Sequence, residues 1–294
     1  MLVKLLVFDP QQPFNMSILS KDTIEKEIIV HLSRPSRGPR IPDEYLVGIV
    51  QLIFHRLKTG TQWRELPVRQ FLPVEYCWNS VYHYFSKWSR DGSWRRLWIY
   101  QLGVKRGLLD LSSAQLDGTH TPCKRGGEAS GYQRRKSAVT SNMLCISDNQ
   151  GVLLAASNPE KGNHHDTFDI EGHLLELIDM LHEAGIETDG LFLNADAAFD
   201  DGRVRAICGE HGIIPNFDLN ARNGSKWDRD VIFDGLLYKR RKVIEHAFAW
   251  LDAYKALLIR YETTALNWYS LNLIGFTTCF IRKAESIKKA QKKL

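Results

Sequence analysis

Three acidic residues, far apart in the chain, occupy positions from which a carboxylate can bind a metal ion. The strand-like pattern in residues 113–121 ends at Asp117, and the apolar run in residues 191–199 ends at Asp196. Glu245 lies in a helix-like segment. An acid just past an apolar strand lies where ligands bind in open α/β sheets, outside the carboxyl ends of the strands. Hard oxygen ligands without His or Cys favour Mg²⁺ or Mn²⁺.

The segment around Glu245 reads as an amphipathic helix, Tyr238–Trp250, with the sequence YKRRKVIEHAFAW. Its apolar residues recur at helical spacing and would form a buried stripe: Ile244, Ala247, Phe248, Leu251 and Leu258. Tyr238, Arg241 and Asp252 lie at offsets −7, −4 and +7 from Glu245, so one line along the helix carries all four. This arrangement suits a carboxylate that binds a cation and an Arg241 that binds a phosphate through a bidentate fork.

Three carboxylates that converge repel one another unless cations neutralise them. Two divalent ions about 3.5–4 Å apart activate an attacking oxygen and stabilise the leaving oxygen at a phosphodiester. We therefore expect two Mg²⁺ ions per active site, with Mn²⁺ able to substitute. Asp117 would bridge both ions, and Asp196 and Glu245 would each hold one. A single strand-end Asp is more often a turn former than a ligand, so the prediction depends on the three acids together.

The elements of residues 111–262 follow an order that brings these acids together. The strand that carries Asp117 is expected to end at this residue, because Gly118 breaks it. Two strands joined by the turn Asp148–Gly151 follow, and then a helix, a strand, a helix, a strand and the Glu245 helix. This order predicts an α/β, ribonuclease H-like fold, a mixed five-stranded sheet with flanking helices, in which the first and fourth strands are neighbours. We expect a short insertion at 218–235.

Residues 41–110 are predicted to form a small all-α domain that binds DNA. One helix begins at Pro42 and ends near Gly60, a second begins near Pro73, and a third spans residues 94–109. The second helix is expected to bury Val74, Cys77, Trp78, Val81, Tyr82, Phe85 and Trp88. The basic outer faces suit a helix-turn-helix-like DNA reader. A helical bundle used for packing or dimerisation is the alternative.

Residues 1–40 precede this domain and residues 111–294 follow it as the catalytic domain, with a C-terminal helix and a Lys-rich tail. The first segment begins a helix with Ser20 as N-cap and ends in the basic stretch RPSRGPR. Arg37 and Arg40 in this stretch are candidate contacts to a DNA backbone or minor groove. A plain linker is equally compatible with the composition.

The charge is modest but clustered. The formal net charge is +5, with 39 Lys and Arg against 34 Asp and Glu. Arg135 and Lys136, expected in the second strand, and the cluster 239–242 lie beside the proposed carboxylates. Clusters in that position favour contacts to a DNA backbone.

The composition indicates a globular protein, with 44% apolar and 25% charged residues. Its five cysteines are spread singly and no pair has metal-ligand spacing, so reduced thiols are expected. No signal-peptide pattern and no long apolar run is present in the sequence. We therefore expect a cytoplasmic protein with no membrane segment, associated with the nucleoid when bound to DNA.

The chain resembles the DDE transposases of bacterial insertion sequences, in the large group that includes the IS-four and IS-five types. The stretches LDGTHT, LNADAAF and YKRRKVIEHAFAWLDAYKALLIRYE carry the resemblance. The signature of the group is Tyr, two residues, Arg, three residues, Glu, six residues, Lys, and Tyr238, Arg241 and Glu245 match it. Asp252 occupies the Lys position. Either Lys255 takes the Lys role, or Asp252 pairs with Arg241.

The resemblance implies a ribonuclease H-like catalytic core that cuts DNA at inverted terminal repeats with Mg²⁺. It further implies that a 3′ hydroxyl is joined to target DNA, and that the protein acts as a homodimer. The GNHHD run, 162–166, is similar to an element of the group. Asp166 is expected to be a helix N-cap, and His164 and His165 are expected to contact DNA or support the cap rather than bind a metal ion. Two alternatives remain: a nuclease that cuts without joining, and a DNA-binding protein that has lost catalysis.

Overall fold

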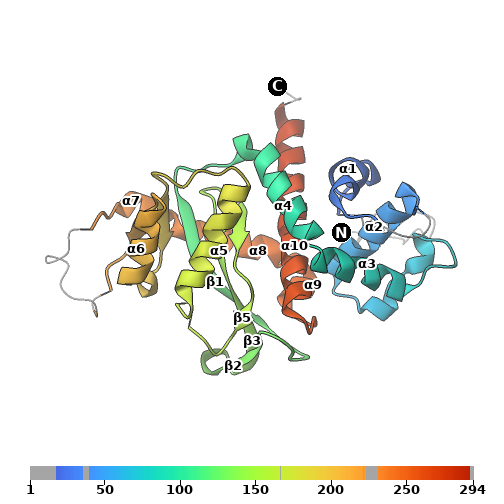
Figure 1. Cartoon of the computed structure of the whole chain (residues 1–294), viewed down its shortest axis with the longest axis horizontal. Coiled ribbons are helices and arrows are strands. Elements are labelled where there is room, and N and C mark those ends of the chain that lie inside the picture. The colour runs from blue at the N-terminus through green and yellow to red at the C-terminus, as the bar shows by residue number, and fades with distance from the viewer. Residues whose placement is uncertain (1–17, 36–39, 166, 221, 223–230, 292–294) are drawn as a thin grey trace, which may run out of the picture.

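A mixed β-sheet lies at the centre of the C-terminal part of the chain (Figure 1). The computed structural model describes residues 18–35, 40–165, 167–220, 222 and 231–291. The strands are β1 Ala114–Pro122, β2 Gly131–Gln133, β3 Ala138–Ser147, β4 Leu153–Ala156, β5 Glu160–Lys161, β6 Phe192–Ala195 and β7 Ile214–Phe217. β3 pairs antiparallel with β1, β2, β4 and β5, whereas β6 pairs parallel with both β1 and β7. β1 and β6 correspond to the first and fourth strands of the predicted order, and they are neighbours in the sheet. This pairing confirms the predicted ribonuclease H-like arrangement.

The prediction that the first strand ends at Asp117 and is broken by Gly118 is wrong. β1 continues through Asp117 and Gly118, which pair with Cys145 and Leu144, and it ends at Pro122. The long partner β3 supplies ladder hydrogen bonds on both sides of the glycine, so tertiary pairing outweighs the low strand propensity of Gly. The predicted turn after β3 is confirmed. Gly151 adopts a positive φ of 77° there.

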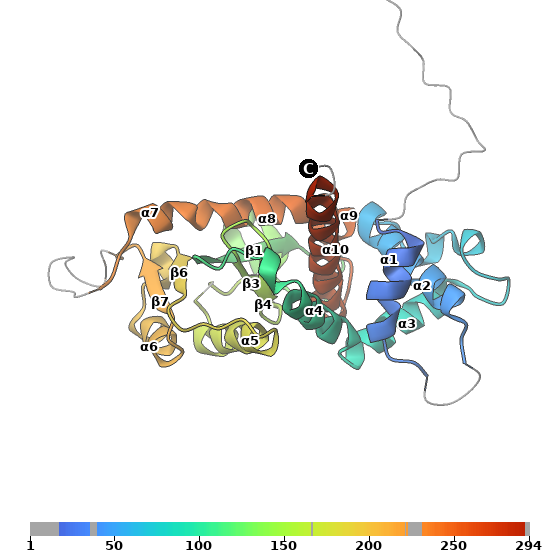
Figure 2. The ribbon, with the colours of Figure 1, turned by 90° about the horizontal axis from the view of Figure 1, so that it is seen from above.

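Helices cover both faces of this sheet (Figure 2). α5 Ile170–Glu183 and α6 Gly202–Glu210 lie on one face, and α7 Gly235–Tyr238, the 3₁₀ helix η9 Lys239–Lys242 and α8 Val243–Leu251 run in line along the other. The expected N-cap of the first of these helices, Asp166, lies outside the described residues. The structure gives Asp201 as the N-cap of α6, where its side chain accepts a hydrogen bond from the amide of Arg203.

The apolar stripe of the Glu245 helix is buried in part as predicted. Ile244, Ala247 and Leu251 are buried, whereas Leu258 is 42% exposed. Leu258 belongs to a separate short helix, α9 Lys255–Leu258, because the chain leaves helical geometry at Tyr254. The periodic pattern therefore extends past the real end of the helix.

The N-terminal helices pack together beside the sheet-bearing part. They are α1 Lys21–Glu27, α2 Asp43–Thr59, α3 Trp78–Arg90 and α4 Ser93–Val104. Short 3₁₀ helices join the elements: η1 Ile29–His31, η2 Trp63–Glu65, η3 Val68–Gln70, η4 Arg106–Leu108, η5 Arg134–Lys136 and η6 Ala197–Phe199. As predicted, Ser20 caps α1 with its side chain, and Gly60 ends α2 with a φ of 70°.

The expected start of the second helix near Pro73 is wrong, because α3 begins at Trp78. Cys77 and Ser80 form a capping box at this point, and the amide of Cys77 donates to the Ser80 hydroxyl. Val74 consequently precedes the helix and is 76% exposed, and Cys77 is exposed as well.

The long helix α10, Ala265–Gln291, connects the two parts of the molecule. It stands between the sheet and the N-terminal helices (Figure 1) and contacts α3, α4 and α8. Trp98 of α4 packs edge-on against Phe276 and Phe280 of α10, with ring centroids 5.8 and 5.9 Å apart. No helix in the described ranges is long and apolar enough to cross a membrane.

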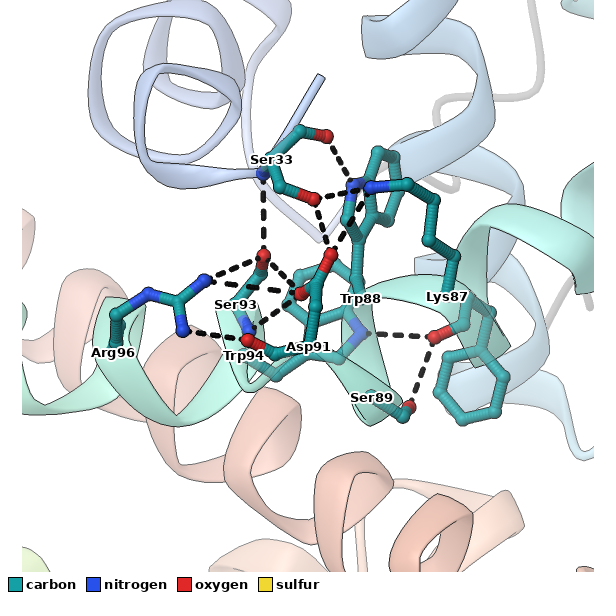
Figure 3. A network of polar contacts seen from close by, with 9 residues as sticks. Ser33, Lys87, Trp88, Ser89, Asp91, Ser93, Trp94 and Arg96 are labelled. Atoms are coloured by element: carbon teal, nitrogen blue, oxygen red, sulfur yellow. Dashed lines mark hydrogen bonds and ion pairs between the residues drawn. The ribbon is translucent and has the colours of Figure 1, made fainter. Parts of the chain in front are cut away.

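A polar clasp at Asp91 fastens the N-terminal segment to the helices (Figure 3). The carboxylate of Asp91 accepts hydrogen bonds from Ser33 and Ser93 and from the ammonium of Lys87, which lies 3.0 Å away. Trp88 donates its indole N–H to the carbonyl of Ser33 at 2.9 Å. These contacts hold the chain after η1 against the turn between α3 and α4.

Candidate active site

The pairing register of three strands aligns acidic residues at one edge of the sheet. In the parallel pair β1–β6, Gln115 lies opposite Asn194, and Asp117 and Asp196 each follow two residues later. In the parallel pair β6–β7, Ala195 lies opposite Phe217, so Asp218 is the next residue along β7. Asp196 and Asp218 therefore follow the carboxyl ends of β6 and β7, at the edge where ligands bind in such sheets, and Asp117 lies at the same level on β1, which continues to Pro122.

A buried ladder of side-chain amides holds this register. Asn194 donates to the side-chain oxygen of Gln115 at 2.8 Å and accepts from the side-chain amide of Asn216 at 2.6 Å. All three residues have no solvent exposure. They precede the three aspartates by two residues, so they lie on the same face of the sheet. A slip by one residue would break the ladder and leave buried amide groups without partners.

The ladder also reaches the helix that carries Glu245. The side chain of Asn216 donates to the carbonyl of Asp234 at 2.9 Å and accepts from its amide at 2.7 Å. Asp234 is the N-cap of α7, where its carboxylate accepts from two backbone amides. The start of the helical run is therefore tied to β7.

A second attachment lies in the middle of that run. Arg240 donates to the side-chain and backbone oxygens of Asn149 at 2.8 Å each, and Asn149 belongs to the turn between β3 and β4. Gly151 of the same turn lies against α8, and a Cβ there would come within 3.4 Å of Val243. Arg240 is thus engaged in holding the helix on the sheet.

The edge of the sheet that carries Asp117, Asp196 and Asp218 is called the acidic edge below. Tyr238 and Arg241 lie there, beside Asp196 and Asp218. Burial raises the pKa of Tyr238, the carboxylates of Asp218 and Asp196 raise it further, and Arg241 lowers it by charge and a hydrogen bond. The phenol, the guanidinium and two strand-end aspartates therefore form one interacting group. A 3₁₀ turn, η9, interrupts the α-helix between Tyr238 and Glu245.

The three expected ligands differ in exposure. Asp117 is half-buried, whereas Asp196 and Glu245 are exposed. Asp117 accepts a hydrogen bond from the amide of Gly118, and Asp196 accepts from the amide of Ala198. Helix α8 contacts β1 and β3. Carboxylate oxygens are the ligands that a hard divalent ion prefers. Within the described part of the chain, no three His, Cys, Asp or Glu side chains are gathered closely enough to hold a metal ion.

The candidate DNA contacts are spread over several elements. Arg135 and Lys136 lie in the 3₁₀ turn η5 rather than in a strand, because β3 begins only at Ala138, and both are exposed. Lys136 donates to the carbonyl of His120. Arg40 is exposed and its guanidinium lies 3.9 Å from Asp43. Arg37 lies outside the described residues.

The position that departs from the signature is exposed. Asp252 is the C-cap of α8, and among the described residues it forms no ion pair with Arg241. Lys255 lies on α9 with its backbone against Gly60 at the end of α2. Its side chain is exposed.

Comparison with protein families assigns both parts of the chain. The model of a family described as "DDE superfamily endonuclease" matches residues 116–277, more than half of the chain. The chain belongs to the DDE superfamily of endonucleases. A second model, described as "Putative transposase of IS4/5 family", matches residues 25–98. Together the two matches make it an IS4/5-type DDE transposase. No curated protein and no solved structure matches it.

The two matches fall on the two structural parts of the transposase, the N-terminal helices and the part that contains the sheet. The IS4/5-family match covers most of the N-terminal helices. The DDE endonuclease match runs from β1 into α10 and contains all three candidate carboxylates. Members of this superfamily act on DNA with divalent metal ions. DNA is therefore the substrate of this transposase.

Two features of the site were not found by sequence reasoning. Asp218 was expected to begin an insertion, although it follows the last apolar residue of β7 as Asp196 follows β6. The side-chain amides of Gln115, Asn194 and Asn216 each precede an aspartate by two residues, and this repeated spacing was the available signal.

Proposed function

We propose that the transposase cuts DNA at inverted terminal repeats and joins the 3′ hydroxyl ends to target DNA, with Asp117, Asp196 and Glu245 as the catalytic carboxylates. The alignment of Asp117 and Asp196 by the β1–β6 register carries this proposal. Helix α8, which contacts β1, supplies Glu245 from the neighbouring element.

The same three carboxylates would hold two Mg²⁺ ions, for which Mn²⁺ can substitute. When bound, the ions activate the attacking oxygen and stabilise the leaving oxygen at the phosphodiester. Asp117 lies on the central strand and is suited to contact both ions, with Asp196 and Glu245 on either side. Because the Glu245 side chain is exposed, it is free to change rotamer and approach the strand ends.

The cations near this edge would bind and orient the DNA. Arg241, held by Tyr238, would form a bidentate contact with a phosphate. Arg135, Lys136 and Lys255 would contact the backbone further out, as would Arg37 and Arg40 in the N-terminal arm. The protein would act as a homodimer on DNA, with one active site for each transposon end.

A cleavage and strand-transfer assay tests the proposal. The substrate is a duplex carrying the inverted repeats that flank the coding region. Glu245→Gln is expected to lower cleavage at least about 100-fold in Mg²⁺ and in Mn²⁺ while duplex binding is kept. Glu210→Gln on α6, which is also exposed, is the matched control and should cleave normally.

The outcomes separate the possible functions. Normal cleavage by Glu245→Gln would remove the proposed mechanism. Cleavage by the native protein without joining would identify a nuclease instead of a transposase that completes transfer. Titration of the protein with Mn²⁺ in the absence of DNA gives an independent readout, since Asp117→Asn and Asp196→Asn should each weaken Mn²⁺ binding.

A further inference from the structure

A cleft lined by aromatic and arginine side chains lies where the N-terminal helices meet the segment before α10. Its volume is about 610 Å³, within the size range of small-ligand sites. The lining comes from the end of α2, from η2, from the start of α3, from the loop after β1 and from residues 261–263 before α10. Its chemistry comes from Arg56, Trp63, Arg64, Trp78, Tyr82, Arg125, Tyr261 and Glu262. Nothing in the mechanism proposed above uses this cleft.

The floor of the cleft is rigid and electrically neutral. Arg56 and Glu262 form an ion pair at 2.7 Å, and their side chains are only 4% and 6% exposed. The indole N–H of Trp63 donates to the same carboxylate at 3.2 Å. Tyr82 packs edge-on against Trp63 with ring centroids 5.2 Å apart. Each floor group therefore has a fixed orientation before any ligand arrives.

The rim carries positive charge. Arg64 and Arg125 are exposed, and no ion pair engages either of them within the described ranges. Arg64 lies over the ring of Trp78, 5.5 Å from its centroid. Tyr261, which also lines the cleft, is 45% exposed. Two arginines suit a phosphate, and the half-buried ring of Trp78 and the exposed ring of Tyr261 suit the flat face of a base.

We propose that this cleft binds an unpaired nucleotide of a DNA strand, with its base stacked among the aromatic rings and its phosphates held by Arg64 and Arg125. An aromatic platform joined to arginines is how proteins hold single-stranded DNA without reading its sequence. Duplex DNA does not suit the cleft, because its base faces are covered by stacking. A transposon end supplies such a nucleotide when its strands are cut or separated.

The cleft lies within reach of the acidic edge. Arg125 follows the end of β1, the strand that carries Asp117, so at about 3.4 Å per residue the chain between them spans at most about 27 Å. This corresponds to roughly eight stacked base pairs. One DNA molecule can therefore contact both places on the same subunit.

Binding to two DNA probes tests the inference. One probe is a blunt duplex, and the other is the same duplex with a short single-stranded 3′ extension containing 2-aminopurine. Measurements in EDTA exclude cleavage. The native protein is expected to bind the extended probe roughly 5- to 100-fold more tightly and to quench the 2-aminopurine fluorescence through stacking.

Two exposed positions give variants that are expected to fold. Tyr261→Ala and Arg64→Ala should remove most of the preference for the extended probe and leave affinity for the blunt duplex unchanged. Tyr132→Ala and Arg106→Ala are the matched controls, because both residues are exposed and neither lines the cleft, and they should keep the preference.

Two results would overturn the inference: equal affinity of the native protein for both probes, or a preference that survives the double variant Tyr261→Ala with Arg64→Ala. The inference depends on the proposed function only for the source of the unpaired strand. The variant Asp117→Asn separates the nucleotide-binding inference from the proposed function. This variant should keep its preference for the extended probe whether or not Asp117 is a catalytic carboxylate.

Discussion

At the scale of single residues, Asp91 shows how local hydrogen bonds outweigh burial. Burial alone would raise its pKa, but hydrogen bonds from Ser33, Ser93 and Lys87 hold the pKa down at about 2. Because this is below the ordinary Asp value of about 3.9, the ionised form stabilises the fold. That contribution is present above about pH 4 and is lost as the pH falls towards 2.

Removing this charge tests the clasp. Asp91→Asn should lower the free energy of unfolding at pH 7 by about 1–2 kcal/mol, a figure reduced to allow for solvent screening of a partly exposed group. The difference from the native protein should shrink as the pH falls from 4 to 2. Urea unfolding followed by circular dichroism measures both. Asp22→Asn, at an exposed pair with Lys26, should leave the urea midpoint of unfolding close to that of the native protein. An equally large loss there would contradict the assignment.

At the scale of elements, the amide ladder decides how the strands meet. The alternation of apolar residues identifies strands, but it does not state which residue of one strand lies opposite which residue of another. Gln115, Asn194 and Asn216 settle this, because a buried amide without a partner costs about 1–3 kcal/mol. The ladder thus converts a local pattern into a fixed alignment of Asp117 with Asp196.

Truncating the centre of the ladder should affect both stability and chemistry. Asn194→Ala is expected to lower the free energy of unfolding by about 1–3 kcal/mol, because the side chains of Gln115 and Asn216 lose a partner. It should also lower cleavage measured on protein that is fully folded at the assay temperature. Asn79→Ala, on the exposed face of α3, is the control for urea unfolding and cleavage. Native cleavage by folded Asn194→Ala would show that the ladder has no positioning role.

At the scale of the whole molecule, a buried ion pair fastens the helical part to the catalytic part. Arg56 at the end of α2 meets Glu262 just before α10, and both side chains are nearly inaccessible to solvent. Arg260, also buried, donates to the backbone of Glu128, Ala129 and Glu262 and so closes the same region from the sheet side. The two parts therefore share an interior.

Replacing only one member of this ion pair should destabilise the folded protein. Glu262→Gln leaves the charge of Arg56 buried without a counterion and is expected to lower the free energy of unfolding by roughly 3–5 kcal/mol. Replacing both residues, Arg56→Met with Glu262→Leu, should recover most of that loss. Glu183→Gln, which breaks an exposed pair with Arg95, should cost no more than about 1 kcal/mol in the same urea titrations. A small effect of Glu262→Gln alone would mean that water reaches the pair.

Much of the fold was predictable because its signals are local. The caps at Ser20 and Gly60, the turn at Asp148–Gly151 and the order of helices and strands each depend on residues within a few positions of one another. The errors occurred where a distant partner or a local cap outweighed periodicity: at Gly118, where β3 extends the strand, and at Pro73, where the capping box delays the helix. Leu258 was misassigned because periodicity alone does not show where a helix ends.

The sequence by itself determined the types of element, their order, the three candidate carboxylates and the family they indicate, because spacing along the chain carries these features. Tertiary structure alone decided the register that aligns Asp117 with Asp196, the attachment of Arg240 to Asn149, and the cleft formed by Trp63, Tyr82 and Tyr261. Each of these joins residues far apart in the chain. Their contacts depend on how whole elements pack, and no local pattern encodes that packing.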